Sequence, residues 1–158
     1  MYSFSDTYRK FEKKIDEIFK TKIKIKDFSQ RRYSGLIPLN SLILNGYIKS
    51  FPQHCFFVSN PYHSLSSINS ISKIISDKKN LKKNTSFSDY TLSPTVCFNC
   101  FEELKKRNIK KNLKISAIAN CYRYESMNYK TLERLRVYLM REYIFFGDKK
   151  FVSNQLKK

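Results

Sequence analysis

Six charged side chains stand close together in the sequence, in a pattern that suits a nucleotide-binding site. They lie in the segment CYRYESMNYKTLERLRVYLMREYIFFG, from Cys121 to Gly147, and they are Arg123, Glu125, Arg134, Arg136, Arg141 and Glu142. A guanidinium group grips a phosphate through two parallel hydrogen bonds, and an aromatic ring beside it can stack on a base. We expect these six side chains to converge on one site.

Two β-strands would position this group. Residues 114–125 and 135–146 read as strands separated by a short loop, which predicts an antiparallel hairpin over residues 114–147. Alternate residues of a strand share a face. One face of the first strand therefore carries Cys121, Arg123 and Glu125, and one face of the return strand carries Arg136, Tyr138, Met140 and Glu142. The alternative is a surface ladder of cross-strand ion pairs, which would add little stability.

Helices and short strands surround this hairpin. Apolar residues at helical spacing predict a helix over residues 3–20, capped by Ser3 or Ser5. The other expected elements are a short strand over 20–26, a helix over 38–45 from Pro38 to Gly46, a strand over 55–59, a helix over 64–76, a solvated loop over 77–89, a helix over 93–108 capped by Ser93, and a last helix from residue 148. Together they predict an α/β (α+β) fold in a single domain, residues 1–158.

The chain is strongly basic. Its 31 Lys and Arg residues against 13 Asp and Glu residues give a formal net charge of +18. Such a charge predicts an acidic partner, such as nucleic acid, a nucleotide or an acidic protein, although abundant Lys, Ile and Asn also fit the codon bias of an AT-rich genome. No apolar run is long enough to cross a membrane and no signal peptide is recognisable, so we expect a cytoplasmic protein without a membrane partner.

Cysteines and histidines are the remaining candidates for chemistry. The cysteines are Cys55, Cys97, Cys100 and Cys121, and they do not form the two C-x-x-C pairs of a zinc ribbon. In a reducing compartment their thiols are expected to stay unpaired, and a buried cysteine packs like a small apolar residue. His54 and His63 are expected to be structural.

The hairpin segment resembles motif 2 of the class II aminoacyl-tRNA synthetases. In that motif Arg-x-Glu, a loop and Arg-x-x-x-Phe lie on an antiparallel hairpin. Arg123, Tyr124 and Glu125 match the first part, while Arg134 and Tyr138 match the second, with tyrosine in place of phenylalanine. The resemblance implies a partial class II synthetase-like antiparallel sheet flanked by helices.

More narrowly, the segment resembles the amino acid–carrier protein ligases, which are relatives of the zinc-containing archaeal seryl-tRNA synthetases. Two further stretches are similar to that family: GYIKSFPQ, residues 46–53, and LSPTVCFNCFEEL, residues 92–104. The likeness extends over residues 36–152. It places a motif 1 region at residues 36–58, with Pro52 near a dimer interface.

The resemblance implies a role for each matching residue. Arg123 would hold the α-phosphate of ATP and the carboxylate of an amino acid, and Arg134 would reach the outer phosphates. Tyr138 would stack on adenine, and Glu142 would orient amino acid and nucleotide. Arg123 and Glu142 are therefore the predicted catalytic residues, and ATP with Mg²⁺ is the predicted cofactor.

The same family implies a zinc ion held by two cysteines and the glutamate of Arg-x-Glu. Cys97 and Glu125 match two of these ligands, and the third has no match in the sequence. An open coordination position on such a zinc ion could bind the amino group of the substrate.

One motif of the family has no counterpart among the 158 residues. Motif 3 carries a Gly-x-Gly-x-(Glu/Asp)-Arg pattern, whose arginine holds the γ-phosphate. Without it the charges that stabilise the leaving pyrophosphate are incomplete, so we expect little activity from this chain alone.

Three functions are compatible with these observations. The first is half of an aminoacyl-adenylating ligase, which activates a small amino acid with ATP for transfer to the phosphopantetheine thiol of a carrier protein. Its partner would be that acyl or peptidyl carrier protein or a missing C-terminal half, unless the chain is a truncated relic, and a homodimer is a further alternative. The second is a non-catalytic module of the same ancestry that binds RNA or an acidic carrier protein. The third is a basic nucleic-acid-binding domain. The sequence lacks the long N-terminal coiled coil of seryl-tRNA synthetases, which argues against a tRNA substrate.

Overall fold

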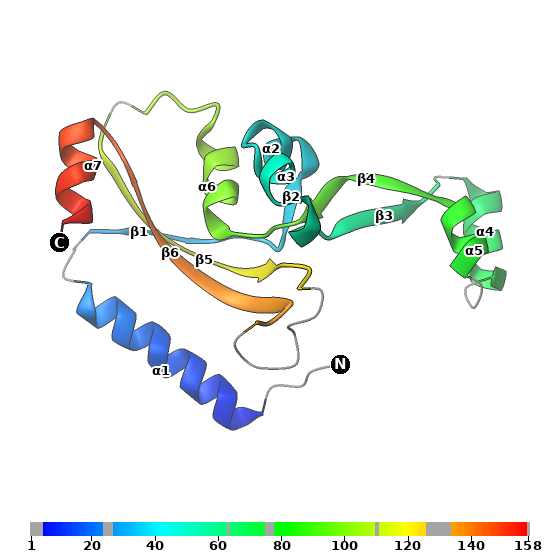
Figure 1. Ribbon diagram of the computed structural model, residues 1–158, viewed down its shortest axis with the longest axis horizontal. Helices are drawn as coiled ribbons and strands as arrows, with labels where there is room; N and C mark the ends of the chain where they lie inside the picture. Colours follow the sequence, from blue (N-terminus) through cyan, green and yellow to red (C-terminus); the bar gives the residue numbers. More distant parts are fainter. Residues whose placement is uncertain are drawn as a thin grey trace.

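The computed structural model describes residues 5–23, 27–62, 64–74, 78–109, 111–125 and 134–157 (Figure 1). In chain order the elements are α1 (Asp6–Lys22), β1 (Ser29–Arg32), β2 (Leu36–Pro38), α2 (Leu39–Leu44), α3 (Tyr47–Ser50), η1 (Pro52–His54), β3 (Phe57–Pro61), α4 (Leu65–Ile74), α5 (Lys78–Lys83), β4 (Thr85–Leu92), α6 (Val96–Leu104), β5 (Leu113–Tyr122), β6 (Val137–Phe146) and α7 (Lys149–Leu156). Within the described residues, the strands form one sheet in the order β1-β5-β6 and another in the order β2-β4-β3.

The predicted hairpin is confirmed as the centre of the first sheet. β5 and β6 pair antiparallel over ten residues each, from Leu113 opposite Phe146 to Tyr122 opposite Val137. β1 adds to β5 in parallel, so this sheet is mixed rather than wholly antiparallel. Helix α6 lies on one face of the sheet and α1 on the other (Figure 1).

The hydrophobic core lies between α6 and the sheet. Alternate residues of β5, from Ile115 through Ala117 and Ala119 to Cys121, are buried against it. Their partners on α6 stand four residues apart and so form one stripe: Val96, Cys100 and Leu104. Cys100 and Cys121 therefore act as small apolar core residues, and all four cysteines are free thiols.

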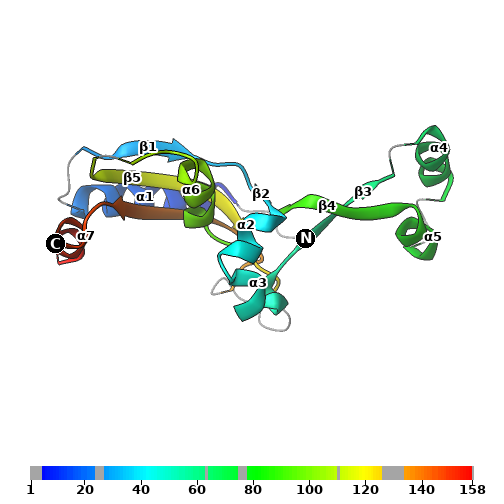
Figure 2. The same ribbon diagram turned by 90° about the horizontal axis from the view of Figure 1, so that it is seen from above.

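The second sheet forms a projecting arm. β3 and β4 pair antiparallel, with an irregularity between Phe57 and Ser59, and α4 and α5 lie at their far end. Figures 1 and 2 show this arm extending away from the first sheet. Its strands expose large apolar side chains, including Phe57 and Phe87, whose rings meet edge to face at 6.0 Å.

Most predicted helices are confirmed. Ser5 caps α1, its hydroxyl accepting a hydrogen bond from the Tyr8 amide. α2 ends just before Gly46, whose positive φ of 72° favours glycine. α4 and α7 also form where they were predicted, within residues 64–76 and from residue 148, and Asp148 caps α7. α6 begins later than expected, with Thr95 rather than Ser93 at its N-cap.

Several short elements were predicted wrongly. Helix α1 continues to Lys22, so residues 20–22 are not a strand, and residues 24–26 lie outside the described part of the chain. The expected loop over 77–89 is wrong, because it contains α5 and most of β4. β4 pairs with strands on both sides, and such pairing can order a polar segment that pattern alone would leave as loop. The strand expected over 55–59 begins at Phe57, and β1, β2 and α3, of at most four residues each, were not foreseen.

No helix within the described residues is long and apolar enough to cross a membrane.

Candidate functional site

The candidate site lies where the end of β5 and the start of β6 meet the N-terminus of α6. Beyond the last strand residue, the Arg123 amide donates to the Arg136 carbonyl at 3.0 Å, which prolongs the hairpin pairing by one step. Alternation along the two strands then places the side chains of Arg123, Tyr138 and Glu142 on the face that α6 covers. The three side chains contact the Pro94–Thr95 segment that opens α6.

The carbonyl of Pro94 holds two of these side chains. Arg123 Nε donates to it at 3.1 Å and the Tyr138 hydroxyl at 3.2 Å. The guanidinium carbon of Arg123 also lies 5.6 Å from the centre of the Tyr138 ring, within the range of a cation–π contact. Burial raises the pKa of Tyr138, so its hydroxyl stays protonated and remains a donor at neutral pH.

Glu142 accepts a hydrogen bond from Thr95 through one carboxylate oxygen, and the Cys97 thiol lies beside the same carboxylate. The Thr95 hydroxyl donates to its Oε1 at 3.0 Å and lies equally close to Cys97 Sγ. Oε2 of Glu142 is buried, and no described residue forms a hydrogen bond with it. A buried carboxylate oxygen without a partner is costly, so this atom is suited to a donor that arrives with a ligand.

The two cysteines beside Glu142 are protonated thiols at neutral pH. Burial raises the pKa of Cys97, and the charge of Glu142 raises it further. Burial and Glu142 likewise raise the pKa of Cys121 to about 12. Neither thiol is therefore activated as a nucleophile, since reactivity requires the thiolate.

A second cluster forms around Glu125. Its Oε1 lies 4.0 Å from His54 Nδ1, and its Oε2 lies 3.6 Å from Arg134 Nη1. The Tyr124 amide also donates to the His54 carbonyl at 3.0 Å, which ties this end of the hairpin to η1. His54, which the sequence suggested was structural, thus contacts a predicted site residue. His63 lies outside the described residues.

These contacts bear on the predicted zinc ligands. The carboxylate that contacts Cys97 is Glu142, whereas Glu125 pairs with His54 and Arg134. Among the described residues, no group of three or more His, Cys, Asp or Glu is placed to hold a metal ion. These residues therefore do not fit a three-ligand zinc site, and zinc binding through Cys97 and Glu125 stays a prediction.

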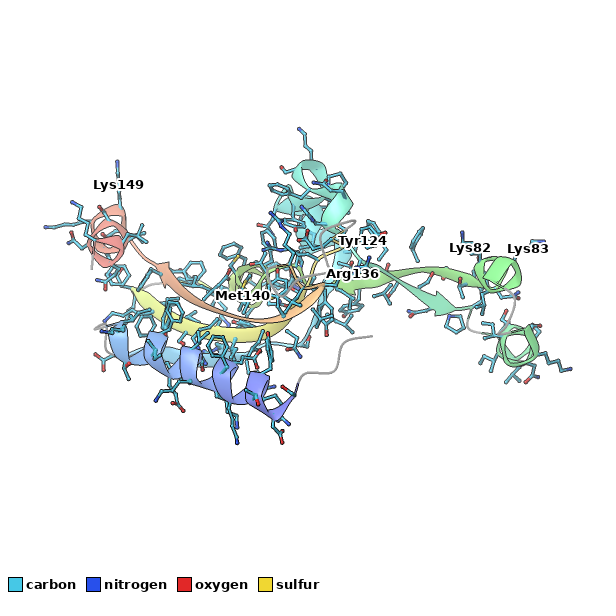
Figure 3. The ribbon with its side chains drawn as sticks, turned by 60° about the horizontal axis from the view of Figure 1, so that its bottom comes forward. Lys82, Lys83, Tyr124, Arg136, Met140 and Lys149 are labelled. Carbon is cyan, nitrogen blue, oxygen red and sulfur yellow. The ribbon has the colours of Figure 1, made fainter. Side chains whose placement is uncertain are left out.

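Not all six charged side chains converge. Arg136 lies over the ring of Tyr124, with 5.0 Å from its guanidinium carbon to the ring centre (Figure 3). Arg141 is on the opposite face of the sheet, where Nη2 donates to Asp16 of α1 at 3.0 Å and Nη1 to Ser116 at 2.8 Å. Its expected convergence with Glu142 is wrong, because neighbouring strand residues point to opposite faces.

No model of a known protein family matches the chain, and no curated protein matches it. Solved structures do. The M. kandleri seryl-tRNA synthetase, solved in complex with A. aeolicus tRNASec, superposes with a TM-score of 0.74 and 18% sequence identity, over 82% of this chain and 27% of that chain. The RNA-binding domain of threonyl-tRNA synthetase from Cryptosporidium parvum Iowa II gives a TM-score of 0.62 and 10% identity, over 94% of this chain and 32% of that chain.

The fold is aminoacyl-tRNA synthetase-like. This confirms the fold that the hairpin motif predicted. The present chain spans about a third or less of the length of the two synthetase chains, at 27% and 32%. Within this synthetase-like fold, the clusters around Glu142 and Glu125 are the candidate functional site.

Proposed function

We propose that the chain binds ATP and an amino acid on the α6-facing side of the β5–β6 hairpin, as half of an aminoacyl-adenylating ligase. The observation that carries this proposal is the placement of Arg123, Tyr138 and Glu142 around Pro94 and Thr95 at the start of α6. A cation, an aromatic ring and a half-satisfied carboxylate thus stand together beside a helix N-terminus.

Each group suits one part of the adenylation reaction, in which an amino-acid carboxylate attacks the α-phosphate of ATP and pyrophosphate leaves. Arg123, oriented through its Nε by the Pro94 carbonyl, would hold the α-phosphate and the attacking carboxylate. The Thr95 hydroxyl makes no capping hydrogen bond to the first amides of α6. Because the amides at a helix N-terminus attract anions, these amides would help to hold the phosphates. The buried Oε2 of Glu142 would accept a hydrogen bond from the amino group of the substrate.

The nucleotide base and the outer phosphates would use the remaining residues. Tyr138 presents its ring in the same cluster and would stack on adenine. Arg134, which contacts Glu125, would turn to the outer phosphates, and Mg²⁺ would accompany the ATP. The 158 residues contain no Gly-x-Gly-x-(Glu/Asp)-Arg pattern, so a group for the γ-phosphate would come from outside them.

The acceptor of the activated amino acid is proposed to be the phosphopantetheine thiol of a carrier protein. RNA is the second candidate, and two observations favour it. The seryl-tRNA synthetase neighbour was solved with a tRNA and the threonyl-tRNA synthetase neighbour is an RNA-binding domain. The net charge of +18 also suits an RNA partner.

Calorimetric titration with ATP and Mg²⁺ tests the nucleotide site. We expect weak binding that falls by about tenfold or more in Arg123→Ala, since a hydrogen bond to a charged group contributes about 1.5–3 kcal/mol. Arg9→Ala removes the same charge from the exposed surface of α1 and should leave the affinity unchanged. Absence of ATP binding by the unmodified chain, or equal binding by Arg123→Ala, would contradict the proposal.

Activity assays separate the candidate functions. The isolated chain should show little amino-acid-dependent pyrophosphate exchange, and a C-terminal half added in trans should restore it. A loaded carrier protein as the product supports the ligase, and a charged tRNA supports the RNA acceptor. A chain that binds RNA without ever binding ATP would replace the first proposal by the second.

A further inference from the structure

A basic pocket lies at the opposite end of β5 from Arg123. It occupies about 340 Å³ between β1, the end of α6 and the start of β5. Its charged lining consists of Arg31, Arg107 and Lys111, and its apolar lining includes Leu104, Leu113 and Ile115. Ile115 and Arg123 are eight residues apart along an extended strand, a separation of roughly 25 Å, so this pocket is distinct from the proposed ATP site.

One carboxylate organises the two arginines. Glu103 Oε1 lies 3.2 Å from Arg107 Nη2, and its Oε2 lies 3.4 Å from Arg31 Nε. The Tyr33 hydroxyl donates to Oε2 at 2.5 Å, and this bond chiefly lowers the pKa of Glu103. Three cations less this one carboxylate leave an excess of two positive charges at the pocket.

The local sequence and the apolar lining both strengthen the attraction of this pocket for an anion. The segment KKRNIKKNLK, residues 105–114, contains six Lys and Arg residues and no acidic residue. Apolar walls of low dielectric increase the attraction of such cations for an anion. A plainer explanation is that basic residues complement the negative end of the α6 dipole. That explanation does not account for Arg31, which comes from β1 and is held beside Arg107 by Glu103.

We propose that Arg31, Arg107 and Lys111 form a binding site for a phosphate group. Two guanidinium groups from different elements can grip a phosphate through forked hydrogen bonds, and a lysine adds a point charge. The phosphate belongs either to an RNA backbone or to a free pyrophosphate or nucleotide. The pocket goes beyond the proposed adenylation site and does not depend on it.

Titration of the ¹⁵N-labelled chain followed by NMR tests this pocket with two probes, sodium pyrophosphate and a single-stranded uridine oligonucleotide. We expect saturable shifts of amides in residues 29–33 and 104–115. In the double variant Arg107→Gln/Lys111→Gln the affinity should fall by about tenfold, as expected for two lost charged contacts. The control Lys82→Gln/Lys83→Gln removes equal charge from the far end of the arm and should change the affinity by less than about twofold (Figure 3).

The two probes distinguish the sources of the phosphate. Competition of both probes for the pocket supports a general phosphate site, whereas response to only one identifies RNA or a free phosphate compound as the ligand. The variant Arg31→Lys keeps the positive charge but loses the guanidinium group that can donate two parallel hydrogen bonds. It should therefore bind both probes more weakly while folding normally.

Three results would overturn the proposal. The first is equal weakening by the Arg107/Lys111 and Lys82/Lys83 double variants, which would mean attraction by net charge alone. The second is lower thermal stability of the Arg107/Lys111 variant with unchanged affinity for both probes, which would leave only the helix-dipole role. The third is a response confined to residues 94–97 and 121–125, which would place the phosphate in the ATP site.

Discussion

The two faces of the β5–β6 sheet use the same two strands in opposite ways. On the α6 face, alternate residues of β5 are buried in a continuous core, and Arg123, Tyr138 and Glu142 lie on this same face. On the α1 face the helix buries none of its residues, and Phe11 and Phe19 remain 62% and 58% exposed. A groove of about 580 Å³, lined largely by apolar side chains, lies between α1 and β6.

Side-chain size and charge explain this difference. Ala117 and Ala119 on the α6 face are small, so the helix can pack closely on the strand. On the other face Arg141 and Tyr143 stand between the sheet and α1, and Asp16 of α1 pairs with Arg141. One face is therefore stabilised by burial of apolar area, and the other depends on an ion pair. Burial fixes site residues in place more firmly than a partly exposed ion pair can.

A core substitution tests this contrast most strongly. Ile115→Ala removes a buried side chain from the α6 face and should lower the free energy of unfolding by about 2–5 kcal/mol. Ile18→Ala acts on the α1 side, where Ile18 is 46% exposed, and should cost less than about 1 kcal/mol. Urea denaturation followed by circular dichroism measures both. Equal losses would show that α1 is packed as firmly as α6.

Zinc titration tests whether Cys97, at the start of α6, binds a metal ion. We expect Zn²⁺ to bind no more tightly than about micromolar, because only two family ligands match and Glu125 contacts His54 and Arg134 rather than Cys97. Cys97→Ser should weaken that binding by about tenfold or more, since a thiolate ligand is lost. Competition with a chromogenic chelator provides the affinities. Tight binding that Cys97→Ser leaves unchanged would place the metal elsewhere on the chain.

Acid should loosen the α1 face. The hydrogen bond from Arg141 chiefly lowers the pKa of Asp16, so the carboxylate stabilises the folded state above its unfolded pKa of about 4. That contribution, about 1 kcal/mol, is lost as the pH falls through the lower folded value. Asp16→Asn should remove this dependence while keeping the side-chain shape.

Thermal unfolding of both proteins between pH 6 and pH 3 measures the effect. Amide exchange within α1 at pH 6 reports whether Asp16→Asn loosens the helix itself. Identical pH profiles for the two proteins would show that this ion pair does not hold α1.

The smallest expected effect is a change in ATP affinity through Arg134, and it rests on the proposed ATP site. Glu125→Gln removes the carboxylate that lies 3.6 Å from Arg134 Nη1, so the arginine is released for phosphates. ATP affinity should rise by about threefold, the size of a surface ion pair, while AMP affinity stays unchanged because AMP lacks outer phosphates. Glu17→Gln, on α1, is a control of equal charge. A parallel gain for AMP would mean that Glu125 acts on the nucleotide through general charge alone.

Local patterns in the sequence determined a large part of this fold. The helical spacing and Ser5 cap of α1, the alternation of β5 and β6, and the Arg-x-Glu motif predicted the hairpin and its synthetase-like fold. These features depend on neighbours within a few residues, which a sequence shows directly. The strand alternation also predicted that Arg123 shares a face of the first strand with Glu125, and that Tyr138 shares a face of the return strand with Glu142.

Only the tertiary structure decided which groups meet across elements. β1 and β4 are short or polar, and each forms because a neighbouring strand supplies its hydrogen bonds. His54 contacts Glu125, and Asp16 accepts a hydrogen bond from Arg141. Glu103, near the end of α6, forms an ion pair with Arg31 of β1. Such contacts join residues far apart in sequence, so no local spacing records them. They arise when core burial fixes the relative position of the elements that carry these side chains.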